Sequence, residues 1–156
     1  MSDRLTKEWT TDTIEAFGDT PSVRKGIVAE QMYLDWANKV YNRVTDHSSD
    51  RTKQVKGFDF SIWKEGWKYE YGVDVKGNMY SNGNFYIEND PKGWLRNPKK
   101  TNHRVVHICA DTGWAIEYDR KKMIEHLDSL NIKEDSVLMS SFDVNIKSLV
   151  RKFKVN

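Results

Sequence analysis

The period of the apolar residues changes near residue 50, and this change constrains the fold more than any other feature. Before it, Thr20 and Pro21 supply a helix N-cap and a proline at the first helical position, where the missing N–H costs nothing. They predict a helix that runs to about Val44. After it, segments 55–63 and 68–78 are rich in β-branched and aromatic residues, which predicts two antiparallel strands joined by a short connection. The chain therefore combines a long helix with a sheet.

Further along, the sequence predicts more strands and a second helix. The strands are expected at 85–88, 104–110, 113–118 and 137–142. Asp119 can cap a helix from Arg120 to about Leu130. This order predicts an α/β (α+β) fold with a mixed central β-sheet flanked by helices. We expect one domain over residues 20–156, preceded by an N-terminal arm, residues 1–19, in which the sequence favours no element.

Composition excludes several classes of protein. Charged residues make up 31% of the chain and no stretch approaches the ~20 apolar residues of a spanning helix, so no membrane partner is expected. The lone Cys109 cannot form an internal disulfide, and the N-terminus lacks the apolar core of a secretory signal, which favours a cytoplasmic location. The formal net charge of +2 identifies no partner, because basic residues can gather on one face.

Glu30 lies in the apolar stripe of the first predicted helix. At about 100° per residue, six apolar or aromatic residues between Ile27 and Val44 fall within about 60° of it. An ionised carboxylate on a buried face is costly unless it is paired or bound to a cation, so Glu30 is a candidate site residue. The alternative is a glutamate that reaches water past the sheet edge or pairs with a lysine.

The predicted strand pair adds two more acids and a lysine. Side chains alternate along a strand, so Asp74 and Lys76 project from the same face. Asp59 lies in the preceding predicted strand and reaches Asp74 only if the register of the pair is offset, which the sequence leaves open. Each of these residues also fits an ordinary strand with a solvent-facing polar side.

Taken together, these residues resemble the catalytic motif of the PD-(D/E)XK nuclease superfamily. The matching pieces are Ala29-Glu30 on the helix, Gly57-Phe58-Asp59 for the first acid, and Val73-Asp74-Val75-Lys76 for the (D/E)xK strand. The common core of this family, αβββαβ, is similar to the predicted order of elements from about residue 21 to residue 142. Phe58 stands where the motif nominally has proline, and Asp74 stands where glutamate is frequent.

The resemblance implies a metal-dependent endodeoxyribonuclease of the small phage or Holliday-junction-resolvase type, acting on duplex or branched DNA. Mg²⁺ or Mn²⁺ would be bound by Asp59, Asp74, the Val75 carbonyl and, directly or through water, Glu30. Lys76 would orient the attacking water and stabilise developing negative charge. A homodimer is one way for so small a nuclease to handle two strands. RNA as the substrate, and exonuclease action, stay open.

Residues 94–104 form the best candidate for contacts with phosphates. Six side chains there are predicted to bind nucleic acid: Trp94, Arg96, Lys99, Lys100, His103 and Arg104. Lysine and arginine neutralise phosphates and an aromatic ring can stack on a base, so the composition fits this role. A solvated loop whose tryptophan packs on the domain fits the same residues.

Two functions of other classes also fit this sequence. One is a non-catalytic nucleic-acid-binding module whose acids are structural, and the other is a protein-interaction domain that keeps a nuclease-like fold without activity. A zinc site is not indicated, since the four histidines form no His-x₃-His pair and there is no Cys-x₂-Cys pair. Neither a Walker-type GxxxxGK[ST] loop nor a strand-linked GxGxxG loop, the two common phosphate-binding glycine loops, occurs in the sequence.

Overall fold

The computed structural model of the chain describes residues 13–15 and 17–156. A six-stranded sheet forms its centre, with the strand order β1-β2-β3-β5-β6-β8. Its strands are β1 (Arg43–Asp46), β2 (Phe60–Trp63), β3 (Tyr71–Lys76), β5 (Arg104–Ile108), β6 (Trp114–Asp119) and β8 (Val150–Lys154). Only β3 and β5 pair in parallel, so the predicted mixed sheet of an α+β fold is confirmed.

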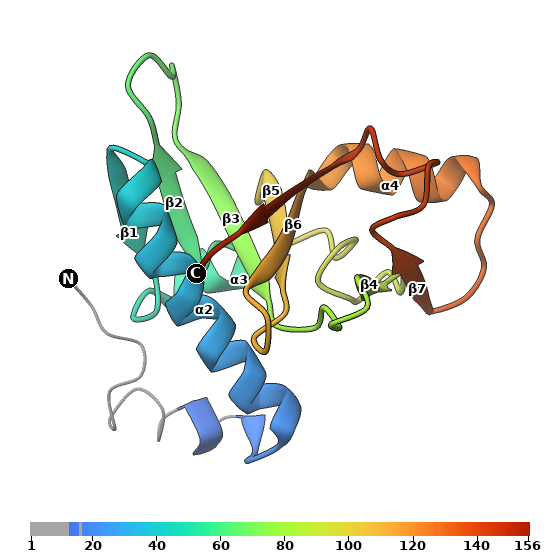
Figure 1. The fold of residues 1–156 in the computed structure, drawn as a ribbon, viewed down its shortest axis with the longest axis horizontal. Coiled ribbons are helices and arrows are strands. Elements are labelled where there is room, and N and C mark those ends of the chain that lie inside the picture. The colour runs from blue at the N-terminus through green and yellow to red at the C-terminus, as the bar shows by residue number, and fades with distance from the viewer. Residues whose placement is uncertain (1–12, 16) are drawn as a thin grey trace.

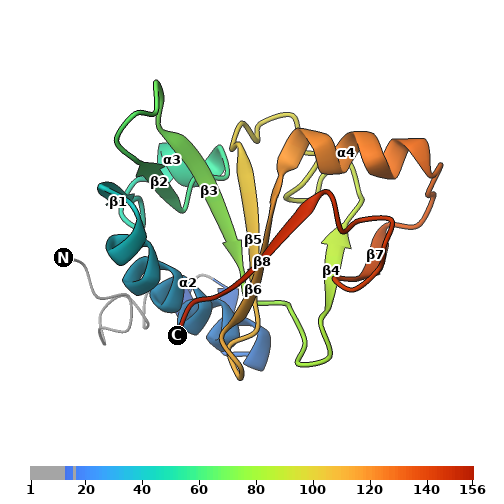
Figure 2. The same cartoon turned by 45° about the horizontal axis from the view of Figure 1, so that its top comes forward.

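Different elements cover the two faces of this sheet (Figures 1 and 2). Helix α2 (Pro21–Val40) packs on one face, and its buried residues join a core cluster with Val73, Val75 and Val106. Helix α4 (Arg120–Ser129) lies on the other, together with a two-stranded sheet of β4 (Asn84–Glu88) and β7 (Ser136–Ser140). Val73 and Val75 of β3 therefore face the core under α2, and Asp74 and Lys76 alternate with them on the opposite side of the sheet.

The long helix begins as predicted and ends earlier than predicted. The Thr20 hydroxyl accepts the Val23 N–H at 3.2 Å, and Pro21 opens α2. The helix stops at Val40, because residues 43–46 form β1 and pair antiparallel with β2. Propensity alone gave no reason for the helix to stop there. The end of the helix is set by the hydrogen bonds that residues 43–46 form with β2, which lies later in the chain.

Three further predictions need correction. Residues 51–55 form helix α3 (Arg51–Val55), whose N-cap is Asp50, so the strand expected at 55–63 starts only at Phe60. The strand expected at 137–142 forms as β7 but pairs with β4 outside the central sheet. Residues 150–154, where the sequence predicted no strand, form β8 along β6.

The N-terminal part of the chain adds little to the described fold. Of the predicted arm, residues 1–12 and 16 lie outside the described residues, and residues 13–15 and 17 are helical. From residue 13 onwards, leaving residue 16 aside, no helix is both long and apolar enough to cross a membrane.

Candidate active site

A pocket of about 360 Å³ opens where the C-terminal end of β3 meets the first turns of α2. The predicted site residues that line it are Glu30, Asp59, Asp74, Val75, Lys76 and Trp94. They come from α2, from the residue before β2, from β3 and from the loop after β4. The fold thus brings together the four residues of the predicted motif and one of the predicted nucleic-acid contacts.

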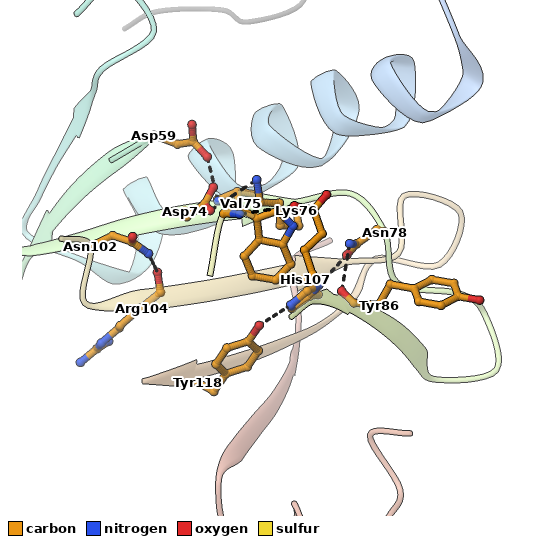
Figure 3. A network of polar contacts seen from close by, with 12 residues as sticks. Asp59, Asp74, Val75, Lys76, Asn78, Tyr86, Asn102, Arg104, His107 and Tyr118 are labelled. Atoms are coloured by element: carbon orange, nitrogen blue, oxygen red, sulfur yellow. Dashed lines mark hydrogen bonds and ion pairs between the residues drawn. The ribbon is translucent and has the colours of Figure 1, made fainter. Parts of the chain in front are cut away.

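Asp59 and Asp74 meet because the strand register differs from a simple hairpin. The observed pairs run from Ile62 opposite Tyr71 to Phe60 opposite Val73, and continuing the register by one pair puts Asp59 opposite Asp74. The connection between the two strands is longer than the sequence suggested, and this length supplies the offset that the motif requires. Figure 3 shows the two aspartates side by side above β3.

The Asp59 carboxylate also caps the end of the strand ladder. Its Oδ2 accepts the backbone N–H of Val75 at 2.8 Å, in place of a further bond between strands. The side chain of Asp59 is also hydrogen-bonded to that of Asp74, which requires a shared proton between the two carboxyls. One backbone bond and one side-chain bond therefore fix the position of Asp59.

Asp74 is the most perturbed acid of the pocket. Its side chain is only 6% exposed. The pKa of Asp74 is raised to about 8, chiefly by burial; the charge of Lys76 opposes this rise and the charge of Asp59 adds to it. In the absence of a cation, Asp74 therefore holds a proton at neutral pH, as expected for a carboxyl that shares a site with another acid.

Lys76 lies beside this acid pair. Its Nζ is 3.4 Å from Asp74 Oδ2 and 5.1 Å from the centre of the Trp94 ring. Burial disfavours the ammonium, but the carboxylates of Asp74 and Asp59 outweigh burial and raise the pKa of Lys76. The side chain is therefore a cation at neutral pH, held between a carboxyl and an aromatic face.

Gly77 brings the end of β3 against the start of α2. A Cβ at this position would lie 2.6 Å from the backbone oxygen of Lys25, closer than real contacts allow. The absence of a side chain at Gly77 therefore allows the backbone of α2 to approach β3 this closely. One turn further along α2, Glu30 reaches the same pocket.

Two features of the pocket were not found by sequence reasoning. Glu88, at the end of β4, lines the pocket, accepts the Trp94 N–H at 3.3 Å and helps to raise the pKa of Lys76. His107, opposite Lys76 on β5, is buried and hydrogen-bonded to Asn78 and, at 2.7 Å, to the Tyr118 hydroxyl (Figure 3). No local pattern marks either residue, because both reach the site through strand pairing.

His107 is a structural member of the site. Burial, and next the charge of Lys76, lower the pKa of His107 to about 3. The ring is therefore neutral across the physiological range. It places a hydrogen-bonded, uncharged surface beneath the lysine, and it does not act as an acid or base.

The predicted nucleic-acid contacts divide into two groups. Trp94 lines the pocket, Lys99 is exposed, and Lys100 lies near enough to lower the pKa of Asp74. The other side chains make contacts with residues of the protein itself. Arg96 binds Asn89 and Asp128, and the ring of His103 accepts the Gly72 N–H.

Arg104 belongs to the second group as well. Its guanidinium lies 3.4 Å from Glu117 and stacks over the rings of Trp67 and Tyr71, at 5.2 and 4.8 Å from their centres. These contacts lie on the α2 face of the sheet, since Arg104 pairs opposite Val73. Arg104 is therefore placed away from the acid pair.

The donor set suits a hard divalent cation. Mg²⁺ is commonly held by one or two carboxylates, with waters and substrate phosphates completing its shell. Asp59, Asp74 and the Val75 carbonyl supply that number of oxygens, and a cation would replace the proton that the two acids share. Over residues 13–15 and 17–156, no three His, Cys, Asp or Glu side chains are grouped as a preformed metal cluster.

Comparisons with protein-family models, with curated proteins and with solved structures give no match for this chain.

Proposed function

We propose that this protein is a metal-dependent nuclease that hydrolyses phosphodiester bonds in DNA, as an endonuclease on duplex or branched substrates, with Mg²⁺ or Mn²⁺ as cofactor. One observation carries the proposal: the hydrogen-bonded pair of Asp59 and Asp74 lies in one pocket with the cationic Lys76. This is the constellation that the resemblance to PD-(D/E)XK nucleases requires.

The charge of the pocket supports a cation as part of the site. Four carboxyls line it, those of Glu30, Asp59, Asp74 and Glu88, against the single ammonium of Lys76. An anionic phosphate would be repelled by these acids, so a phosphodiester substrate requires a cation between them. When bound, the divalent ion supplies an acidified water and polarises the scissile phosphate.

The side chains of the pocket have separate tasks in this proposal. Asp59 and Asp74 give up their shared proton and hold the cation. Lys76, fixed by Asp74 and the Trp94 ring, donates a hydrogen bond to a non-bridging phosphate oxygen, where negative charge develops. Glu30, which approaches from α2, orients water. Lys99 and Lys100 bind neighbouring phosphates outside the pocket.

Cleavage assays test the proposal directly. Supercoiled, linear and four-way-junction DNA are incubated with the protein in EDTA, Mg²⁺ or Mn²⁺, and nicking is followed on gels. We expect cleavage with either metal and none in EDTA. Asp74→Asn should abolish it, while the matched control Asp111→Asn, an exposed acid outside the pocket, should retain full activity.

The assay also separates the other two functions. Binding of DNA without cleavage in every metal would identify a nucleic-acid-binding module, and neither binding nor cleavage would point to a protein-interaction domain. Full activity of Asp74→Asn would refute the assignment of the catalytic pocket.

A further inference from the structure

A second hollow lies at the edge strand β8. A pocket of about 370 Å³ there is lined by Ser141, Phe142, Val144, Lys147, Val150 and Lys152. A smaller pocket of about 140 Å³ shares Ser141, Phe142 and Lys152 with it and continues to Trp114. Because the pockets share a wall, together they fit a ligand with one charged part and one flat, apolar part.

The larger pocket holds two like charges. Burial, and next the charge of Lys147, lower the pKa of Lys152, so the two ammonium groups lie near enough to repel each other. The Lys152 ammonium rests 3.3 Å from the centre of the Phe142 ring, a cation–π contact that offsets part of this repulsion. An anion bound between the two lysines would remove the repulsion, which suits the pocket to a phosphate group.

Ser141 adds a polar group without a partner. The residue is 2% exposed, and its hydroxyl oxygen is buried with no hydrogen bond. Buried polar side chains are nearly always hydrogen-bonded, so an orphan of this kind calls for an explanation. Ser141 lines both pockets, so a rotation of its side chain would bring the hydroxyl to a ligand oxygen in either of them.

Two aromatic rings at the pockets are unusually exposed. Phe142 is 70% exposed and Trp114 is 46% exposed. Large aromatic side chains are usually well buried, and exposed ones beside cations are the elements of a base-stacking surface. The smaller pocket therefore provides a place for a planar base next to the place for a phosphate.

This second hollow shares a face of the sheet with the candidate active site. Strand register puts Lys76 opposite His107, His107 opposite Ile116, and Ile116 opposite Lys152. Directly paired residues project to the same side, so Lys76 and Lys152 lie on one face, three inter-strand steps or about 14 Å apart. The connection between β3 and β4 contributes residues to both sites.

We propose that this hollow is a second nucleotide-binding subsite on the same nucleic-acid strand, with a backbone phosphate between Lys147 and Lys152 and a base against Phe142 and Trp114. The proposal rests on the nuclease function proposed above. A separation of about 14 Å equals about four axial rises of a duplex strand and fewer steps along its twisted backbone, so a short stretch of one strand reaches both sites. The subsite would thus hold the substrate a few nucleotides from the bond that is cut.

Binding measured without cleavage tests the subsite. Fluorescein-labelled single-stranded and duplex DNA are titrated in EDTA with the full-length Asp74→Asn chain, and anisotropy gives the affinity over a range of salt. Lys147→Gln/Lys152→Gln is compared with Lys39→Gln/Lys133→Gln, two exposed lysines that line neither pocket, so that both double variants lose the same charge.

If the subsite binds the strand, Lys147→Gln/Lys152→Gln should weaken DNA binding about tenfold near 0.1 M salt and lower the slope of log affinity against log salt by about 1.5. The control pair should change affinity less than about twofold. Phe142→Ala should weaken binding about fivefold through lost stacking.

Several outcomes would overturn the subsite. Equal affinities and slopes for the two double variants refute it, and they leave the nuclease proposal standing if the unsubstituted chain still cuts DNA. If the unsubstituted chain neither binds DNA in EDTA nor cuts it in Mg²⁺ or Mn²⁺, both proposals fail. Deoxyadenosine monophosphate is titrated alone as well. Binding of that nucleotide that depends on the lysine pair, without any effect of the pair on the oligonucleotides, assigns the hollow to free nucleotides and refutes the strand subsite.

Discussion

Replacing Asp74 by asparagine should stabilise the folded protein at alkaline pH while it abolishes cleavage. Burial raises the pKa of Asp74 from 3.8 to about 8. The folded state therefore binds a proton that the unfolded chain has already released between these values, and the stability contributed by Asp74 falls as the pH rises through about 8. Asparagine is neutral at every pH, and its amide can donate to Asp59 as the shared proton does.

The magnitude follows from the pKa of Asp74. The rise from 3.8 to about 8 sets a ceiling of about 6 kcal/mol for the stability lost between acidic and alkaline pH. Relaxation and water entry around a buried charge reduce such penalties, so we expect the free energy of unfolding of Asp74→Asn to exceed that of the parent by about 1–3 kcal/mol at pH 9. For a chain of this length that is a rise in melting temperature of about 3–10 °C.

Thermal unfolding in EDTA from about pH 3.5, below the unfolded pKa of 3.8, to about pH 9 measures the effect, because the stability falls over the interval between the two pKa values. The two melting curves should coincide at the acidic end and separate towards the alkaline end. Mg²⁺ at alkaline pH should raise the melting temperature of the parent and leave that of Asp74→Asn unchanged, because only the parent binds the ion tightly. Its affinity for the parent should rise about tenfold per pH unit up to about pH 8. Parallel stability profiles for the two chains would refute the reasoning.

Three further substitutions test the remaining structure. Lys76→Met should lower the cleavage rate about 10²–10³-fold and leave the DNA affinity in EDTA nearly unchanged. If the cleavage rate and the DNA affinity fall by the same factor, Lys76 has no catalytic role. Gly77→Ala should cost about 2 kcal/mol in unfolding free energy and reduce cleavage, since its Cβ meets the backbone of α2, whereas Gly26→Ala, where a Cβ meets nothing, should be stabilising by about 0.5–1 kcal/mol. Arg104→Met should destabilise by about 1–3 kcal/mol because the buried Glu117 loses one partner, and the salt dependence of DNA binding should stay the same; a shallower slope would make Arg104 a phosphate contact.

Local signals predicted the elements whose ends are set by neighbouring residues. The N-cap Thr20 and the helix cap Asp119 both perform the roles that their residue types indicated. Residues 43–46 and the C-terminal β8 were missed, because each is the outermost strand of the sheet. A segment forms an edge strand when another strand of the fold has an unpaired edge, and the sequence of the segment itself does not show whether such an edge exists.

The same limit applies to the candidate site. Alternation along one strand was enough to place Asp74 and Lys76 together, because that relation is local. Glu88 was missed because a strand of the second sheet brings it to the pocket, and His107 was missed because the parallel pairing of β5 with β3 places it opposite Lys76. Arg96 shows the reverse error: a basic residue in a loop was read as a surface contact, and it binds Asp128 of α4 within the fold.

One feature of the chain explains how Asp59 comes to lie beside Asp74. A Cβ at Gly72 would lie 2.4 Å from the ring of Phe58, so the ring crosses β3 at the one residue that has no side chain. This packing holds the residues before β2 against β3 in the observed register, and the carboxylate that follows Phe58 then falls opposite Asp74. A bulky aromatic residue before the first acid thus has a positional role where the nuclease motif nominally has proline. The departure from the motif at Phe58 is therefore compatible with the geometry that the motif requires.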